Sequence, residues 1–268
     1  MSRRQISILM VAAALGLASA DAEARTVLRV DVEMTQFRVF LSDGSVLPQS
    51  RLPGAVLSLG DGSGSTRSLR IDAVEPDTRD PTGEIMLYTF SERDAATGEW
   101  RNACQPDPDG RRLGFPIPGA FTADMRYVPA PGRLSITCTG GAEGKCIRFG
   151  YKPWGHAPDG ASLAPYYQAC LRLVRADYRG DGVGHTRNGM PIDIFDRIGI
   201  QTDEPARGMT LEAAWGPDGA LCVAHVRLPQ DPKLVSTSDS VQNLQGRLSP
   251  LCDETTPALL YDRSFERR

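Results

Sequence analysis

The segment VRADYRGDGVGHTRNG, residues 174–189, contains a histidine, two carboxylates and four glycines. His185 is the base that a hydrolase would need, because imidazole titrates near neutral pH. Asp177 and Asp181 are the carboxylates that could assist it, and the glycines around them would leave the loop adaptable. The segment therefore suggests an exported hydrolase as one hypothesis, although no G-x-S-x-G nucleophile motif occurs in the chain.

The same segment could instead bind calcium. Hard cations require several converging oxygen ligands, and acidic, glycine-rich loops often supply them. The candidate ligands are Asp177, Asp181 and Asn188, followed in the chain by Asp193 and Asp196. The D-x-D-x-D-G spacing of an EF-hand is absent. The simpler interpretation is that these residues shape the turn after a helix, and we expect no metal and no cofactor.

The two other histidines and one glycine-rich segment could also take part in chemistry, but their sequence context indicates structural roles. His225 alternates with apolar residues on a predicted strand, and His156 lies in a Pro/Gly-rich loop beside a tryptophan. The segment TGGAEGKC, residues 139–146, resembles a phosphate-binding loop, but its glycines are one residue too close and Cys146 replaces the hydroxyl that would hold magnesium. We expect a turn between two cysteines there.

Six cysteines follow the first hundred residues, and an even number is typical of disulfides in an exported protein. A bridge between Cys138 and Cys146 would close a short loop, and one between Cys222 and Cys252 would tie the tail to a strand. The sequence does not determine which cysteines pair. A zinc site is not indicated, because the chain has no C-x2-C pair. All six residues are disulfide candidates: Cys104, Cys138, Cys146, Cys170, Cys222 and Cys252.

The N-terminal segment has the layout of a secretory signal peptide, residues 1–20 with an alternative cut at 24. Arg3 and Arg4 precede an apolar run that is too short to span a bilayer, and Ala18-Ser19-Ala20 supplies the small residues of a cleavage site. We expect a periplasmic or extracellular protein without a transmembrane segment after cleavage. Removing residues 1–20 leaves 28 basic and 33 acidic groups, so nothing suggests a nucleic-acid partner. A protein or glycan partner in the envelope or outside the cell is compatible with this composition.

The chain alternates between strand and turn patterns over residues 26–100, which predicts a β-rich N-terminal region. Phe37, Val39 and Leu41 share one face before a turn at Asp43-Gly44. One amphipathic helix is predicted at about 162–178, with Ser162 as N-cap and Gly180 in the left-handed position after it. A hairpin is predicted around Gly216-Pro217-Asp218-Gly219, and the tail after Cys252 is expected to fray. The expected fold is therefore α+β and β-rich: two groups of strands, one prominent helix and disulfides.

Two segments resemble a known family. CTGGAEGKCIRFGYKPWG, residues 138–155, and YYQACLRLVRADYRGDGVGHTRNGMPIDIFD, residues 166–196, are similar to the ADYC domain of exported bacterial proteins. The similarity is strongest between about 98 and 230, and residues 101–262 are predicted to form the ADYC-like domain. The family is named for an Ala-Asp-Tyr-Cys tetrapeptide, and the resemblance implies a compartment but no activity.

This chain has Arg179 where the resemblance places the motif cysteine. A guanidinium cannot act as a nucleophile, so a reaction that needed that cysteine would be lost here. A structural disulfide at that position in other members fits better, because losing both partners leaves an even number of cysteines. The sequence therefore favours a non-catalytic, disulfide-stabilised binding or structural domain, and the alternative is a hydrolase that uses His185 with Asp177 and Asp181.

Overall fold

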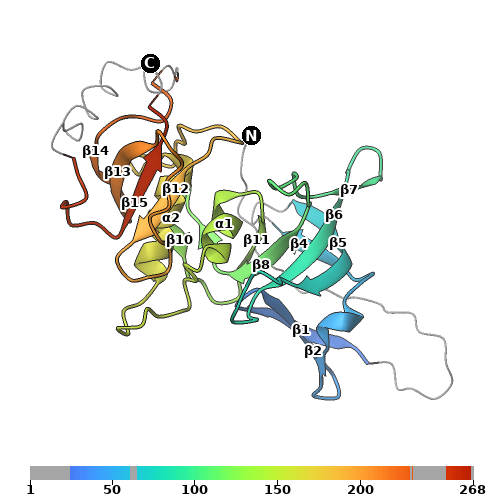
Figure 1. The fold of residues 1–268 in the computed structure, drawn as a ribbon. Helices are drawn as coiled ribbons and strands as arrows, with labels where there is room; N and C mark the ends of the chain where they lie inside the picture. The colour runs from blue at the N-terminus through green and yellow to red at the C-terminus, as the bar shows by residue number, and fades with distance from the viewer. Residues whose placement is uncertain (1–24, 61–64, 230, 232–251, 267–268) are drawn as a thin grey trace. The chain divides into compact units, whose positions relative to one another are not determined.

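A computed structural model describes residues 25–60, 65–229, 231 and 252–266 (Figure 1). The predicted signal peptide lies outside these residues. Within them, no helix has the length and apolar character needed to cross a membrane. The chain forms two compact units: unit 1 runs to residue 122 and includes 127–144, and unit 2 comprises 123–126 and the residues from 145 onward. The described residues contain many strands and two α-helices, which confirms the β-rich α+β fold.

Unit 1 is built from antiparallel sheets. Its largest sheet has the strand order β11-β8-β6-β5-β4, and β7 pairs with β6. A second sheet has the order β1-β2-β3, and β9 pairs with β10. The strands are β1 (Val27–Glu33), β2 (Gln36–Leu41), β3 (Val46–Leu47), β4 (Val56–Gly60), β5 (Thr66–Pro76), β6 (Met86–Arg93), β7 (Trp100–Asn102), β8 (Gly114–Pro118), β9 (Ala120–Phe121), β10 (Tyr127–Val128) and β11 (Leu134–Cys138), with a 3-10 turn at Gln49–Arg51.

The alternation predicted for β2 is confirmed, because Phe37, Val39 and Leu41 are all buried. Side chains two residues apart on a strand share a face, so these three enter one core. The rings of Phe37 and Tyr88 lie edge to face with centroids 5.4 Å apart, and Tyr88 stacks on Phe90 with centroids 5.3 Å apart. The core of unit 1 is therefore an aromatic cluster between the two sheets.

Unit 2 contains a four-stranded antiparallel sheet with the order β12-β15-β13-β14. Helix α2 packs against β13, β14 and β15 of this sheet (Figure 1). The helices are α1 (Ala142–Arg148), which spans the boundary between the units, and α2 (Ala164–Arg175), and the strands are β12 (Asp193–Asp196), β13 (Thr210–Gly216), β14 (Gly219–Val223) and β15 (Leu260–Ser264). The predicted hairpin joins β13 to β14.

Two sequence expectations were wrong. The tail after Cys252 does not fray throughout: β15 pairs with β12 and β13, and Leu260, Tyr261 and Asp262 are fully buried. The sequence did not reveal this strand, because Asp262 and Arg263 interrupt its apolar pattern. Residues 139–146 are not a plain turn, because α1 begins at Ala142.

Three disulfides join Cys104 to Cys138, Cys146 to Cys170 and Cys222 to Cys252. The bridge considered between Cys138 and Cys146 does not form. Cys138 ends strand β11, whereas Cys146 lies in α1 and bonds to the buried stripe of α2. The bridge between Cys222 and Cys252 connects β14 to the chain that leads into β15, as the sequence suggested.

Candidate functional site

The segment that follows α2 is the candidate site, and it begins with an unusual helix end. The helix stops at Arg175, three residues before the predicted end, and Ala176 adopts a left-handed conformation with φ 49° and ψ 43°. Its N–H donates to the carbonyls of Arg172 and Leu173. Glycine is the usual residue at this position. Ala176 is fully buried, so its methyl group fills space that glycine would leave empty.

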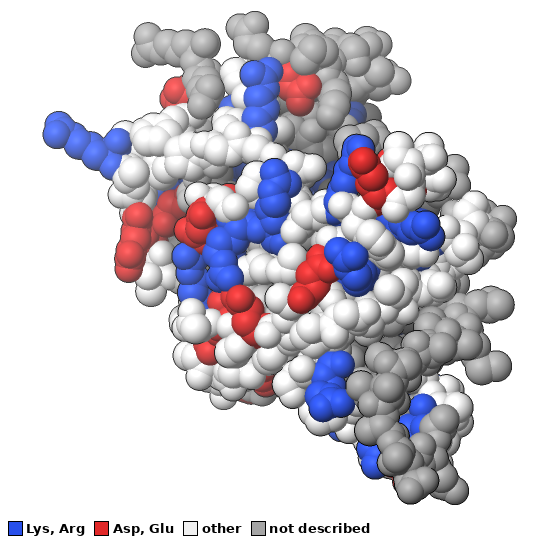
Figure 2. Space-filling model, turned by 90° about the vertical axis from the view of Figure 1, so that its right-hand side faces the viewer, with Lys and Arg blue, Asp and Glu red and all other residues white. Residues whose placement is uncertain are grey.

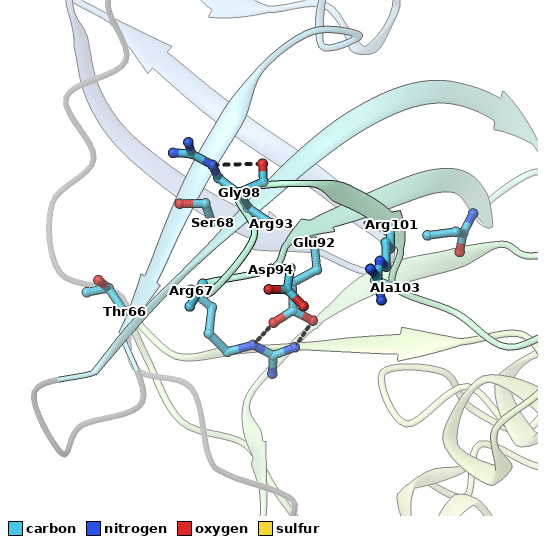
Figure 3. A pocket seen from close by; sticks show the side chains of 11 residues that line it. Thr66, Arg67, Ser68, Glu92, Arg93, Asp94, Gly98, Arg101 and Ala103 are labelled. Atoms are coloured by element: carbon cyan, nitrogen blue, oxygen red, sulfur yellow. Dashed lines mark hydrogen bonds and ion pairs between the residues drawn. The ribbon is translucent and has the colours of Figure 1, made fainter.

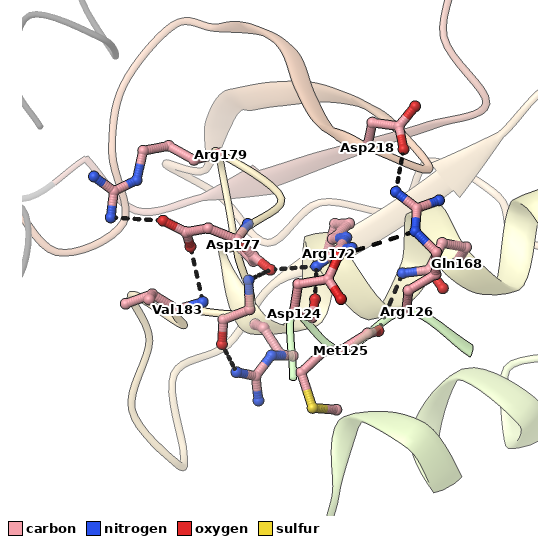
Figure 4. A network of polar contacts seen from close by, with 12 residues as sticks. Asp124, Met125, Arg126, Gln168, Arg172, Asp177, Arg179, Val183 and Asp218 are labelled. Carbon is pink, nitrogen blue, oxygen red and sulfur yellow. Dashed lines mark hydrogen bonds and ion pairs between the residues drawn. The ribbon is translucent and has the colours of Figure 1, made fainter. Parts of the chain in front are cut away.

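Asp177 is fully buried and bound on all sides (Figure 4). Its Oδ2 lies 2.7 Å from Nη1 of Arg172 and accepts the N–H of Gly182, and its Oδ1 accepts the N–H of Asp181. Burial raises the pKa of Asp177, and the ion pair with Arg172 opposes that effect. This carboxylate closes the loop after the helix and has no oxygen directed at solvent.

Arg172 extends the same cluster. Its Nη1 also donates to the carbonyl of Asp124 and its Nε to the carbonyl of Pro217, in the β13–β14 turn. Close backbone packing completes the arrangement: a Cβ at Gly180 would lie 2.1 Å from the carbonyl oxygen of Asp218. Gly180 is left-handed as predicted, with φ 74°, but it shapes the loop and not the helix end.

Tyr178 connects this loop to the sheet. Its hydroxyl donates to Oε1 of Glu212 at 2.8 Å and accepts the backbone N–H of Arg227 at 2.7 Å. The ring stacks on Trp215 with centroids 5.3 Å apart. Burial raises the pKa of Tyr178 well above its usual value, so the phenol remains a hydrogen-bond donor.

Arg227 is the centre of a buried ion network that the sequence did not reveal. Its Nε donates to Glu212 and its Nη2 to Asp262, at 2.9 and 2.8 Å. Burial favours a lower pKa for Arg227, but the charges of Glu212 and Asp262 outweigh it and raise that pKa. The remaining donors reach the carbonyls of Leu173 and Val174 at the end of α2 and the hydroxyl of Thr186.

All five N–H groups of the Arg227 side chain therefore have acceptors. Asp262 is bound from the other side by the indole N–H of Trp215 at 2.7 Å. Burial and the charge of Glu212 raise the pKa of Asp262 well above its usual value. The sequence signal for this network was weak: β13 and β15 each contain a single acid, Glu212 and Asp262, but β15 also contains Arg263 and Ser264.

His185 is also interior to unit 2. Its side chain is 1% exposed, and its Nδ1 lies 3.2 Å from Oδ2 of Asp231. The ring stacks on Tyr178 with centroids 6.0 Å apart. Burial lowers the pKa of His185, although Asp231 opposes that effect. The imidazole has the carboxylate partner of a catalytic histidine, but a substrate in solvent has no access to it.

A family model described as the ADYC domain matches residues 49–229, which is more than half of the chain. The chain belongs to the ADYC domain family. Its matched span begins well before residue 98, so it also covers β4 to β6 of unit 1. No curated protein and no solved structure matched the chain.

The geometry gives the first three residues of the ADYC signature separate structural roles. Ala176 ends the helix, Asp177 closes the following loop and Tyr178 joins that loop to the sheet. Arg179, at the position that the resemblance assigns to a cysteine, pairs with Asp181 at 2.9 Å. The signature of this ADYC domain therefore specifies how α2 is attached to the sheet of unit 2.

The other candidate ligands of the ADYC domain do not converge. Asp181 pairs with Arg179 and accepts the N–H of Val183, and Asn188 is exposed. Asp196 accepts four backbone N–H groups and the hydroxyl of Tyr151, so it organises a turn. Asp193 accepts the N–H of Glu204. Within the described ranges, no group of three or more His, Cys, Asp or Glu could hold a metal ion.

The two remaining histidines lie apart from the signature segment. His156 is exposed, at an isolated bridge to Ser162. Nε2 of His225 lies 3.2 Å from the hydroxyl of Thr210. Each therefore has a position that favours packing or turn formation over catalysis.

Proposed function

We propose that this ADYC domain is an exported, disulfide-stabilised binding domain of the bacterial envelope or of the secreted fraction, and that it is not a hydrolase. The observation that carries the proposal is the burial of the candidate base: the side chain of His185 is 1% exposed. A general base must come within hydrogen-bond reach of the proton that it removes. Asp177 is likewise buried and paired with Arg172.

Export is supported by two features. Residues 1–24 have the charge, apolar run and small residues of a signal peptide. All six cysteines are paired, and such bridges persist in oxidising compartments. Expression of the full chain in a bacterium, followed by fractionation and N-terminal sequencing, tests this part. We expect a mature N-terminus after residue 20 or 24 in the periplasm or medium, and an uncleaved chain with free thiols in the cytoplasm would refute it.

Activity assays test the non-catalytic part. The purified protein is incubated with ester, peptide and glycan panels beside His185→Ala and Asp181→Ala. Asp181 is the sharper probe, because it lies on the loop surface and its replacement should leave the fold intact. We expect no turnover in any panel. Turnover that Asp181→Ala abolishes, with the melting temperature unchanged, would overturn the proposal in favour of the hydrolase.

A further inference from the structure

A polar hollow of about 640 Å³ lies at the ends of β5, β6 and β7 in unit 1 (Figure 3). Ligand pockets in proteins span about 300–1,000 Å³, so its size suits a small or extended ligand. Ala95, Gly98 and Ala103 are its only small apolar lining residues. Polar and charged residues dominate the rest, among them Arg67, Arg93, Arg101, Glu92, Asp94 and Ser68.

The strand register explains how charges come to line this hollow. Leu69 pairs with Glu92, and Glu92 pairs with Arg101, so these positions form one row across β5, β6 and β7. Leu69 is buried, whereas Glu92 and Arg101 continue the same face beyond the core. On this face the apolar surface of the middle of the sheet is replaced by charge at the strand ends. Arg93 pairs with Trp100 and belongs to the opposite face, so the hollow is lined from both faces where the strands end.

The hydrogen bonds already made in the hollow leave an excess of donors. Arg67 binds Glu92 through two N–H groups, Arg93 donates one to the carbonyl of Gly98, and Arg101 donates one to Glu99. Three guanidinium groups carry fifteen N–H donors, so eleven have no acceptor among the described residues. Water hydrates such exposed donors in the free protein, and a ligand rich in acceptors can replace that water.

The acidic residues in the lining, Glu92 and Asp94, do not remove the preference of the hollow for a ligand rich in acceptors. Glu92 accepts hydrogen bonds from Nε and Nη2 of Arg67. Oδ1 of Asp94 accepts the N–H groups of Ala96 and Thr97, which form the turn before β7. No ion pair of Arg93 occurs in the described ranges, and the pair between Arg101 and Glu99 is two-thirds exposed on both sides. An exposed pair of this kind is weak, so a ligand can compete with Glu99 for Arg101.

The charges of the surface do not form a region of one sign. Basic and acidic side chains are interspersed on the face drawn in Figure 2. In unit 1, several arginines away from the hollow have acidic partners, as Arg79 has Asp109 at 2.8 Å. A general attraction for any polyanion is therefore not what the surface provides, whereas the hollow brings three arginines together at one concave place.

We propose that the hollow binds an anionic polysaccharide, whose carboxylate or sulfate groups accept hydrogen bonds from Arg93 and Arg101. Guanidinium groups match the two-oxygen geometry of such anions. Sugar hydroxyls suit Ser68 and the second oxygen of Asp94, and the absence of large apolar lining residues disfavours a peptide, which would need an anchor side chain. This inference rests on the proposed function, since it names the ligand of the binding domain.

Binding of the oxidised chain to four probes tests the inference: polygalacturonate, dextran sulfate, neutral dextran and poly-L-glutamate. Biolayer interferometry at 50 and 300 mM NaCl is the readout. We expect one or both acidic polysaccharides to bind and neutral dextran not to bind. Arg93→Ala and Arg101→Ala should each lower the affinity fivefold to tenfold. Arg79→Ala is the matched control, because Arg79 and Arg101 are both about two-thirds exposed and each is paired with one acid at 2.8–2.9 Å.

The outcomes separate this inference from the proposed function. No binding to either acidic polysaccharide, or equal weakening by Arg79→Ala, overturns the inference and leaves the binding domain standing. Stronger binding of poly-L-glutamate assigns the hollow to an acidic protein and also overturns it. Turnover that Asp181→Ala abolishes refutes the proposed function without bearing on these affinities. Thermal melting of each variant confirms that a lost affinity reflects the hollow and not the fold.

Discussion

The two units use arginine in opposite ways. In unit 2, Arg227 is buried and all five of its side-chain donors have protein acceptors. In unit 1, Arg93 and Arg101 lie at an open hollow, and each uses one donor within the described residues. Removal from water is costly for a charge, so a buried arginine needs counter-charges and acceptors from the protein, whereas the donors of an exposed one are hydrated and can be transferred to a ligand.

This difference reverses the impression given by the sequence. The segment around His185 has the densest collection of reactive residue types, yet those side chains hold α2 on its sheet. The segment of β5 to β7 has no recognisable motif, yet it carries the unused donors. Residue type alone does not identify a structural ion network; the burial and the ion pairs of the side chains do.

The largest effect is expected for Arg227→Met, which tests the difference between the buried arginine of unit 2 and the exposed arginines of unit 1. Methionine keeps much of the volume but leaves Glu212 and Asp262 buried without their counter-charge. Breaking a buried ion pair in this way costs about 3–5 kcal/mol. Urea denaturation should show that loss in the free energy of unfolding, whereas Arg101→Ala should lose less than about 1 kcal/mol. Similar losses for the two variants would contradict the distinction between the units.

The next effect concerns the bridge between the two helices. Replacing Cys146 and Cys170 by alanine removes a crosslink with a sequence separation of 24 residues. Loop-closure entropy predicts a loss of roughly 3 kcal/mol. The double variant should unfold at a lower urea concentration than the parent. An unchanged midpoint would mean that the ion network holds α2 without the disulfide.

Much of the fold was predictable, because it depends on local patterns. The alternation of Phe37, Val39 and Leu41 identified a strand face, and the stripe around Cys170 identified α2. The strand status of β15 was not predictable, since Asp262 and Arg263 interrupt its apolar pattern. Asp262 is accommodated there by Arg227, from a part of the chain 35 residues away.

The candidate site was predicted less well for a related reason. The sequence singled out His185, Asp177 and Asp181 in a glycine-rich segment. It could not show that Arg172 pairs with Asp177, or that Asp231 lies beside His185, in the folded state. Nor could it show that Arg93 and Arg101 line one hollow, because that depends on where β5, β6 and β7 end. Contacts between residues that are far apart in the sequence determine both the ion pairs of the loop and the lining of the hollow.

Tyr178→Phe probes the hydrogen bonds of the network without changing its charges. The variant leaves Oε1 of Glu212 and the N–H of Arg227 without their shared partner in the interior. An unsatisfied buried group costs about 1–3 kcal/mol, so we expect a loss in that range. Tyr166→Phe, at a half-buried tyrosine on α2, is the control and should lose less. Equal losses would indicate that the hydroxyl of Tyr178 is not part of the network.

The pH dependence of stability tests the burial of His185. Burial lowers its pKa in the folded state. Below about pH 6.5 the unfolded chain therefore binds a proton that the folded chain rejects, and stability falls as the pH drops from 7 toward 5. His185→Gln should remove this part of the decline. The melting temperature of the parent and of His185→Gln is measured against pH, and the difference between the two curves is the readout. The difference is needed because the raised pKa values of Asp177 and Asp262 favour the folded state as the pH falls. Parallel curves would contradict a buried neutral imidazole.

The smallest expected effect is that of the ion pair between Arg67 and Glu92 at the hollow. Its geometry is bidentate, which is favourable, but the two side chains are 47% and 32% exposed. Water already solvates both charges, so the pair should contribute less than about 1 kcal/mol and less still at high salt. A double-mutant cycle with Arg67→Ala and Glu92→Ala measures the coupling directly. A coupling as large as that of Arg227 with Glu212 would place the hollow among the structural networks, and the functional distinction between the two units would then fail.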